Sequence, residues 1–170
     1  LAAVDEHRPD LVLVDVRMPP TFTSEGIRAA LVVRQQHPDT AVMVLSQYVE
    51  EQYATELVAA RSKGVGYLLK DRVADTSDFI AALRDVAGGG TVLDPEVVTQ
   101  LLTRARHADP LAALTPRERD VLDLMAQGRT NSAIGKQLYV SDGAVEKHVT
   151  SIFTKLDLAP TNEEDRKAHV

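Results

Sequence analysis

The first half of the chain alternates short apolar runs with longer amphipathic stretches. Residues 11–14, 41–45 and 64–69 are apolar or glycine at every position. Runs of this kind are typical of strands that are buried on both faces of a parallel sheet. The stretches between them carry apolar residues at helical spacing and predict helices. Strands that alternate with helices predict an α/β domain with a doubly wound parallel sheet. The predicted helices cover residues 24–36, 50–61 and 74–87, and the last of them is expected to turn Phe79, Ile80, Leu83 and Val86 inward.

Glycine and proline then divide the chain. Gly88–Gly90 ends the last of these helices, and a further helix is expected over residues 94–106, with Asp94 as its cap and Pro95 at its first position. Because three strands are too few for a stable doubly wound domain, we expect that this sequence lacks the domain's first strands. The expected division is a first domain over residues 1–88, a linker with a helix over residues 89–110 and a second domain over residues 111–170.

The second domain has the pattern of three helices on one small core. Its last helix, which Ser141 can cap, carries one apolar stripe, and the opposite face is polar. A short helix begins near Thr130 and is joined to the last one by a tight connection. This plan predicts an all-α helix-turn-helix domain, whose second helix can enter the major groove of DNA. A purely structural three-helix bundle with a solvated polar face has the same periodicity. The apolar stripe consists of Val145, Val149, Ile152, Phe153 and Leu156, and the polar face of Gly143, Glu146, Lys147, Thr150 and Thr154.

Short motifs favour the DNA-binding alternative. Leu114–Arg119, Val121-Leu122, Gly128, Ala133–Gly135 and Val145–Val149 together resemble the LuxR-type (NarL/FixJ-type) DNA-binding domain at the spacing of that family. The resemblance implies that double-stranded DNA is the partner. It also implies that base and phosphate contacts come from Glu146, Lys147 and Thr150. His148 lies beside the apolar stripe, where we expect it to pack or to contact a phosphate.

Three polar side chains follow the three predicted strands. Asp15, Ser46 and Lys70 each stand where a buried strand ends. Because the carboxyl ends of parallel strands meet at one edge of a sheet, we expect these side chains to converge. A carboxylate can attack phosphorus, an ammonium can pair with the phosphoryl oxygens, and a hydroxyl can donate to them. Each of the three could equally be an ordinary polar residue at a loop.

Together these residues resemble the receiver domain of bacterial response regulators. The resemblance implies that Asp15 is the phosphoacceptor, that Ser46 and Lys70 are switch residues, and that Tyr67 is the aromatic switch; Tyr67 could also be a surface tyrosine. Receivers bind Mg²⁺ through the phosphoacceptor, a backbone carbonyl and an acidic pair after their first strand. Here Asp15 and the carbonyl of Arg17 can be assigned. Mg²⁺ is therefore expected only if an upstream segment supplies the acidic pair.

Charge and composition set limits on these hypotheses. The net charge is −6, and residues 111–170 hold 8 Lys and Arg against 9 Asp and Glu. Attraction to phosphates should therefore be modest for each subunit, and we expect homodimers to compensate. The chain has no cysteine, which excludes thiol catalysis and disulfides. No apolar run approaches the roughly 20 residues that span a bilayer. We therefore expect a cytoplasmic protein without a membrane partner.

The sequence thus predicts a two-domain response regulator transcription factor rather than an enzyme. A sensor histidine kinase would phosphorylate Asp15 and so control dimerisation and DNA binding. One alternative keeps the DNA-binding module but makes the receiver a dimerisation domain that works without phosphorylation. A haloacid dehalogenase-like phosphatase would also place its nucleophile at Asp15. That class carries a second Asp two residues later, where this chain has Arg17.

Overall fold

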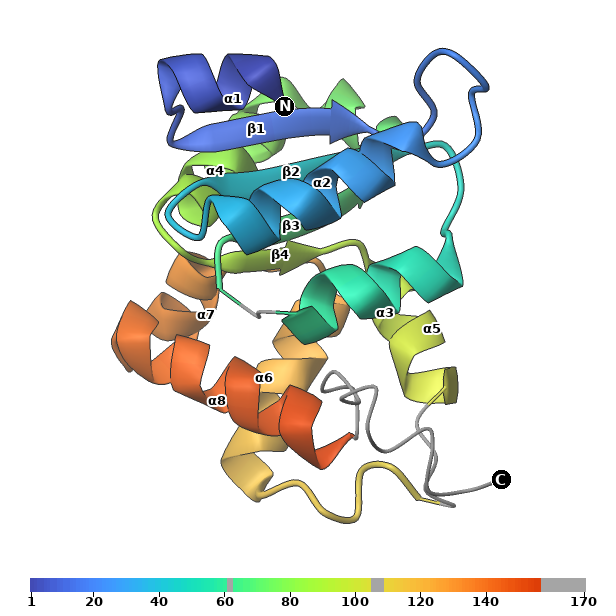
Figure 1. Cartoon of the computed structure of the whole chain (residues 1–170). Coiled ribbons are helices and arrows are strands. Elements are labelled where there is room, and N and C mark those ends of the chain that lie inside the picture. Colours follow the sequence, from blue (N-terminus) through green and yellow to red (C-terminus); the bar gives the residue numbers. More distant parts are fainter. Residues whose placement is uncertain (61–62, 105–108, 157–170) are drawn as a thin grey trace.

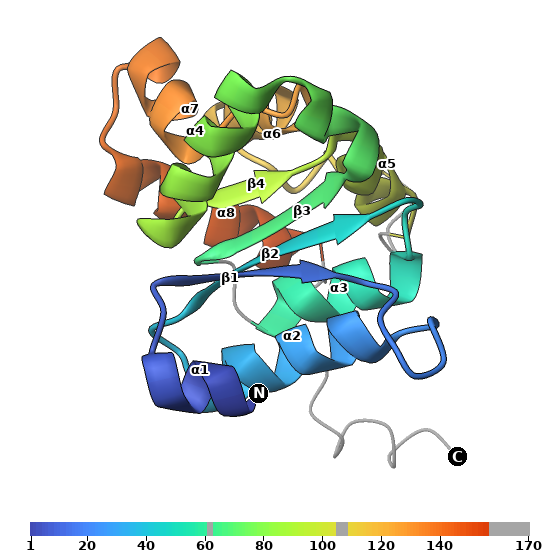
Figure 2. The same ribbon diagram turned by 90° about the horizontal axis from the view of Figure 1, so that it is seen from above.

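The computed structural model describes residues 1–60, 63–104 and 109–156. Its first unit is a parallel sheet of four strands in the order β1-β2-β3-β4, with helices on both faces (Figures 1 and 2). Helices α2 and α3 cover one face and α4 covers the other (Figure 2). This confirms the doubly wound parallel sheet expected from the pattern. The elements of this unit are α1 (Ala2–His7), β1 (Leu11–Asp15), α2 (Glu25–Gln36), β2 (Ala41–Ser46), α3 (Glu51–Ala60), β3 (Val65–Leu69), a 3-10 turn η1 (Lys70–Ala74), α4 (Thr76–Ala87) and β4 (Thr91–Leu93).

Two expectations about this unit were wrong. The sequence predicted three strands, but the described sheet has a fourth, because Thr91 pairs with Val65 and Leu93 with Tyr67 in parallel register. The strand opens the segment that was expected to be a linker, and it was missed because three residues are too short to show a pattern. Ile80, expected to face inward on α4, is 41% exposed, while Ala82 and Val86 are buried.

The second unit is helical. After α5 (Pro95–Arg104), the chain forms α6 (Pro116–Ala126), α7 (Asn131–Leu138) and α8 (Asp142–Lys155). Thr115 caps α6 and completes a capping box with Glu118, while Thr130 and Ser141 cap α7 and α8. The whole apolar stripe of α8 is buried, as its spacing predicted.

The two units share one apolar core. Leu57 and Val97 belong to the same cluster of buried side chains as Val121 and Val149. Helix α5 bridges the units, because it packs against α3 on one side and against α6 on the other (Figure 1). Helix α6 also packs against β4, so the helical unit lies beside the edge of the sheet that β4 forms.

Candidate functional site

Asp15 and Lys70 meet at the carboxyl edge of the sheet. Lys70 Nζ lies 2.5 Å from Asp15 Oδ2, and the two side chains are 47% and 39% exposed. The backbone N–H of Arg17 donates to the other carboxylate oxygen of Asp15 at 3.1 Å. The hydrogen bond from Lys70 is the main reason why the pKa of Asp15 is lower than usual, although burial opposes it. The pair is therefore a charged carboxylate and an ammonium that remain accessible to solvent.

Ser46 and Tyr67 meet at a different atom, the backbone carbonyl oxygen of Tyr48. Ser46 Oγ donates to it at 2.5 Å, and the phenol of Tyr67 donates to it at 3.2 Å. The same phenol accepts from the N–H of Glu50 at 3.1 Å. Tyr67 is fully buried, which excludes the surface tyrosine that the sequence left open. The two side chains thus fix the segment after β2, and among the described contacts neither bonds to Asp15.

Arg17, two residues after Asp15, contacts a charged and an aromatic side chain, and these contacts were not predicted from the sequence. The guanidinium of Arg17 donates to Glu50 Oε1 at 3.3 Å and lies 5.8 Å from the ring centroid of Tyr48. These residues come from the loops after β1 and β2. Their side chains connect the loop after Asp15 to the segment that Ser46 and Tyr67 hold.

A glycine allows the backbone of Asp15 to approach α2. A Cβ atom at Gly26 would lie 1.6 Å from the carbonyl oxygen of Asp15, which no rearrangement of side chains could relieve. The N–H of Gly26 donates to the carbonyl of Val16 at 3.0 Å. The first turn of α2 therefore packs directly on the backbone that carries Asp15.

The groups at this edge fit a hard cation that uses oxygen ligands. No group of three or more His, Cys, Asp or Glu side chains suited to a metal occurs within residues 1–60, 63–104 and 109–156. Mg²⁺, however, is commonly held by one or two carboxylates and keeps several waters. The half-exposed carboxylate of Asp15 is a ligand of that kind, and in this structure it is paired with Lys70.

The polar face of α8 carries the residues predicted to contact DNA. Lys147 and Thr150 are exposed, whereas Glu146 and His148 are half-buried. Thr150 Oγ1 donates to the carbonyl of Glu146 at 3.0 Å. These four side chains lie on one helix, but Glu146 is turned toward the other unit.

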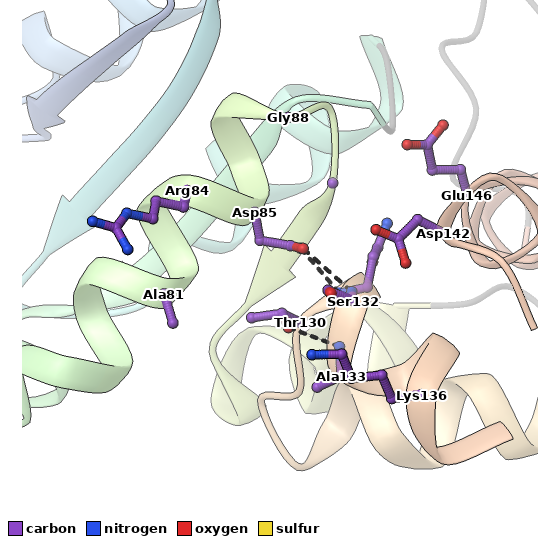
Figure 3. Close-up of a pocket in the computed structure, with 12 residues that line it drawn as sticks. Ala81, Arg84, Asp85, Gly88, Thr130, Ser132, Ala133, Lys136, Asp142 and Glu146 are labelled. Carbon is purple, nitrogen blue, oxygen red and sulfur yellow. Dashed lines mark hydrogen bonds between the residues drawn. The ribbon is translucent and has the colours of Figure 1, made fainter. Parts of the chain in front are cut away.

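Asp85 joins the two units. This residue, near the end of α4, accepts hydrogen bonds from the backbone N–H groups of Asn131 and Ser132 at 3.0 and 3.2 Å (Figure 3). The carboxylate thereby caps the first turn of α7 across the boundary between the units. Gly90 makes room for it, because a Cβ there would lie 2.3 Å from Asp85 Oδ2. This contact could not be predicted from the residues alone.

A second contact extends the attachment to β4. The side-chain amide of Asn131, in the orientation that suits its neighbours, donates to the carbonyl of Thr91 at 3.1 Å and accepts from its N–H at 3.3 Å. An open hollow of about 470 Å³ remains beside it, lined in part by Asp85, Asp142 and Glu146 (Figure 3). Burial, together with those two acidic neighbours, raises the pKa of Asp85 above its usual value, although its two N–H donors oppose this.

No helix within the described residues is long and apolar enough to cross a membrane.

Comparison with known proteins gives two family matches. Residues 1–84 match the response regulator receiver domain, and residues 112–163 match the bacterial regulatory proteins of the luxR family. The transcriptional regulatory protein DegU of Brevibacillus brevis is 33% identical over 174 residues, covering 91% of this chain and 71% of DegU. The oxygen regulatory protein NreC of Staphylococcus haemolyticus is 34% identical over 164 residues, covering 91% of this chain and 73% of NreC. A structure of the RcsB response regulator of Salmonella typhimurium aligns loosely, with a TM-score of 0.46 and 23% identity over 95% of this chain and 75% of that one.

Proposed function

Because the chain belongs to the response regulators that join a receiver domain to a LuxR-type DNA-binding domain, we propose that Asp15 is its phosphoacceptor and that phosphorylation controls how the second unit binds DNA. The observation that carries this proposal is the pairing of Asp15 with Lys70 at the carboxyl edge of the sheet. Both groups are accessible, and the lowered pKa keeps Asp15 ionised and ready to act as a nucleophile.

The chemistry follows from these groups. A carboxylate oxygen of Asp15 attacks the phosphorus of a phosphohistidine on a sensor kinase, so that an O–P bond forms while the N–P bond breaks and the histidine keeps the electron pair. The ammonium of Lys70 then pairs with the phosphoryl oxygens instead of the bare carboxylate. Mg²⁺, when bound, neutralises charge on the transferring group, and Asp15 with the carbonyl of Arg17 would help to hold it.

Ser46 and Tyr67 act as the switch in this proposal. The hydroxyl of Ser46 now donates to the carbonyl of Tyr48, and a phosphoryl group on Asp15 offers stronger, charged acceptors. If Ser46 turns to the phosphoryl group, the carbonyl of Tyr48 loses one of its two donors. The segment after β2 would then be free to rearrange, and Tyr67 would follow it through the same carbonyl.

The DNA-binding part of the proposal rests on α8. Lys147 is exposed and can reach a guanine edge or a phosphate, and Thr150, also exposed, lies on the same polar face of α8. His148 contributes at most a contact at the margin, since it is half-buried. Because the second unit is not basic, a homodimer on paired half-sites is the arrangement that gives useful affinity.

Phosphorylation can be tested by intact-mass measurement. In a chain that includes an upstream segment with the acidic pair, Mg²⁺ and a small phosphodonor such as acetyl phosphate should add one phosphoryl group, and Asp15→Asn should gain none. Asp39→Asn changes the same charge at an exposed turn and should behave like the parent. Equal labelling of Asp15→Asn would contradict the assignment. Absence of labelling in the parent would favour the alternative in which the first unit only dimerises.

A further inference from the structure

Asp94 is a fully buried carboxylate that the proposed chemistry does not use. It stands directly after β4 and has no exposed surface. Leaving such a charge without partners would be costly, and it has three donors. The N–H of Leu69 and the Nε of Arg72 donate to Oδ2 at 3.2 and 3.1 Å, and the N–H of Glu96 donates to Oδ1 at 3.1 Å.

Two of these donors lie on either side of Lys70. Leu69 is the residue before Lys70, and Arg72 lies two residues after it in the 3-10 turn η1. One carboxylate oxygen therefore holds both ends of the short segment from which Lys70 reaches Asp15. The turn itself is exposed at Lys70 and has no buried residue, so packing does little to fix it.

The third donor ties the same carboxylate to the bridging helix. Glu96 lies in the first turn of α5, so Asp94 caps that helix as well. Pro95 at the start of α5 lies close to Gly128 in the second unit, where a Cβ would lie 3.5 Å from the proline ring. Asp94 thus connects the turn that carries Lys70 with a helix whose first residue touches the DNA-binding unit.

We propose that Asp94 is a positioning residue that holds Lys70 against Asp15 and links the displacement of Lys70 to α5 and the DNA-binding unit. This inference rests on the proposed function, since it assumes that Lys70 reports the state of Asp15. When Lys70 moves to a phosphoryl group, the η1 turn moves with it. Because Asp94 grips that turn and the start of α5 together, the helix is displaced too.

The positioning role can be measured on the unphosphorylated chain by NMR. The ammonium protons of Lys70 should exchange slowly enough to be detected while they bond to Asp15, and Asp15→Asn should abolish that signal and so identify it. Asp94→Asn keeps the shape but loses the charge, and it should also abolish the signal. Asp71→Asn removes an exposed carboxylate from the same turn and should leave the signal intact. A Lys70 signal in Asp94→Asn as strong as in the parent would overturn the positioning role.

A second variant guards against a general loss of structure. Arg72→Gln removes one of the two hydrogen bonds between Asp94 and the turn. The buried carboxylate keeps its two backbone N–H donors. Its Lys70 signal should weaken while the dispersion of the other amide resonances stays that of the parent. An unaltered Lys70 signal in this variant would show that the hydrogen bond between Arg72 and Asp94 does not help to position Lys70.

The link to the second unit is tested by a double-mutant cycle. Asp15→Asn releases Lys70, and the amide resonance of Gly128 should shift in the parent background but not in the Asp94→Asn background. Equal shifts in both backgrounds, or none in the parent, would overturn the link. Neither measurement requires phosphorylation or DNA, so failure of the proposed function and failure of this inference can be told apart.

Discussion

Glu118 is the residue whose replacement should damage the DNA-binding unit most specifically. Its side chain is 5% exposed and accepts three hydrogen bonds, from the N–H of Thr115 at 2.9 Å, Ser151 Oγ at 2.7 Å and Lys155 Nζ at 2.8 Å. It therefore ties the start of α6 to the last turns of α8, the helix that carries the polar face proposed to contact DNA. Glu118→Ala removes all three contacts, whereas Glu118→Gln removes the charge and keeps the shape.

The expected magnitudes follow from these contacts. Breaking a buried charge pair costs roughly 3–5 kcal/mol, and losing one partner of a capping box about 1 kcal/mol. Burial by itself would raise the pKa of Glu118, but the hydrogen bonds from Lys155, Ser151 and Thr115 lower it to about 2. A shift from 4.5 to about 2 corresponds to at most about 3 kcal/mol, and to roughly half of that because Lys155 is 34% exposed and screened. We expect a loss of about 3–5 kcal/mol for Glu118→Ala and about 2 kcal/mol for Glu118→Gln.

The dependence on pH separates the charge from the shape. Because the folded pKa is depressed, the ionised carboxylate stabilises the fold fully above pH 4.5, and this contribution is lost as the pH falls toward 2. Urea titration of the whole chain, followed by circular dichroism, should show a gap between the parent and Glu118→Gln at pH 6 that narrows by pH 3. Asp123→Asn, an exposed carboxylate on the same helix, is the matched control. A Glu118→Gln variant as stable as Asp123→Asn at pH 6 would refute the reasoning.

Two further predictions concern the DNA surface and the attachment between the units. Lys147→Ala should weaken binding of a labelled duplex by about 1–3 kcal/mol if Lys147 contacts a base, or lower the salt slope by about one unit if it contacts only phosphate; unchanged binding in titrations at two salt concentrations would remove α8 from the interface. Asp85→Ala leaves two N–H groups of α7 without their acceptor and should speed hydrogen exchange at the amides of Asn131 and Ser132, while Asp85→Asn keeps an acceptor and should speed it less. Equal exchange in the parent and in Asp85→Ala would show that Asp85 does not protect these amides.

Much of the fold follows from the sequence because its signals are local. Buried strands can be recognised in the sequence as runs of consecutive apolar residues. Helix starts can be recognised by cap residues, here Thr115, Thr130 and Ser141. Strand β4 was not predicted because three residues are too few to show a periodic pattern. Its strand conformation comes from pairing with β3. Ile80 was misplaced because helical spacing alone does not say how far a buried face extends around α4.

The proposed phosphorylation site, too, could be predicted only in part. The convergence of Asp15 and Lys70 could be predicted, since parallel strands end at one edge of a sheet. The common acceptor of Ser46 and Tyr67 could not, because it is a backbone carbonyl and carries no residue-specific signal. The bonds from Asp94 to the turn of Lys70 could not be predicted either. The sequence position of Asp94 indicates only that it caps a helix.

The contact at Asp85 differs in kind from the shared apolar core that joins the units elsewhere. It consists of polar bonds beside an open hollow rather than of interlocked apolar side chains. Burial, Asp142 and Glu146 disfavour a charge on this carboxylate and raise its pKa, whereas the hydrogen bonds from the N–H groups of α7 favour the charge. Glu146 belongs to the polar face of α8, so DNA that approaches this face meets the same cluster of carboxylates. Because these contributions oppose one another, we expect the polar contact to add less to the attachment of the units than the apolar core does.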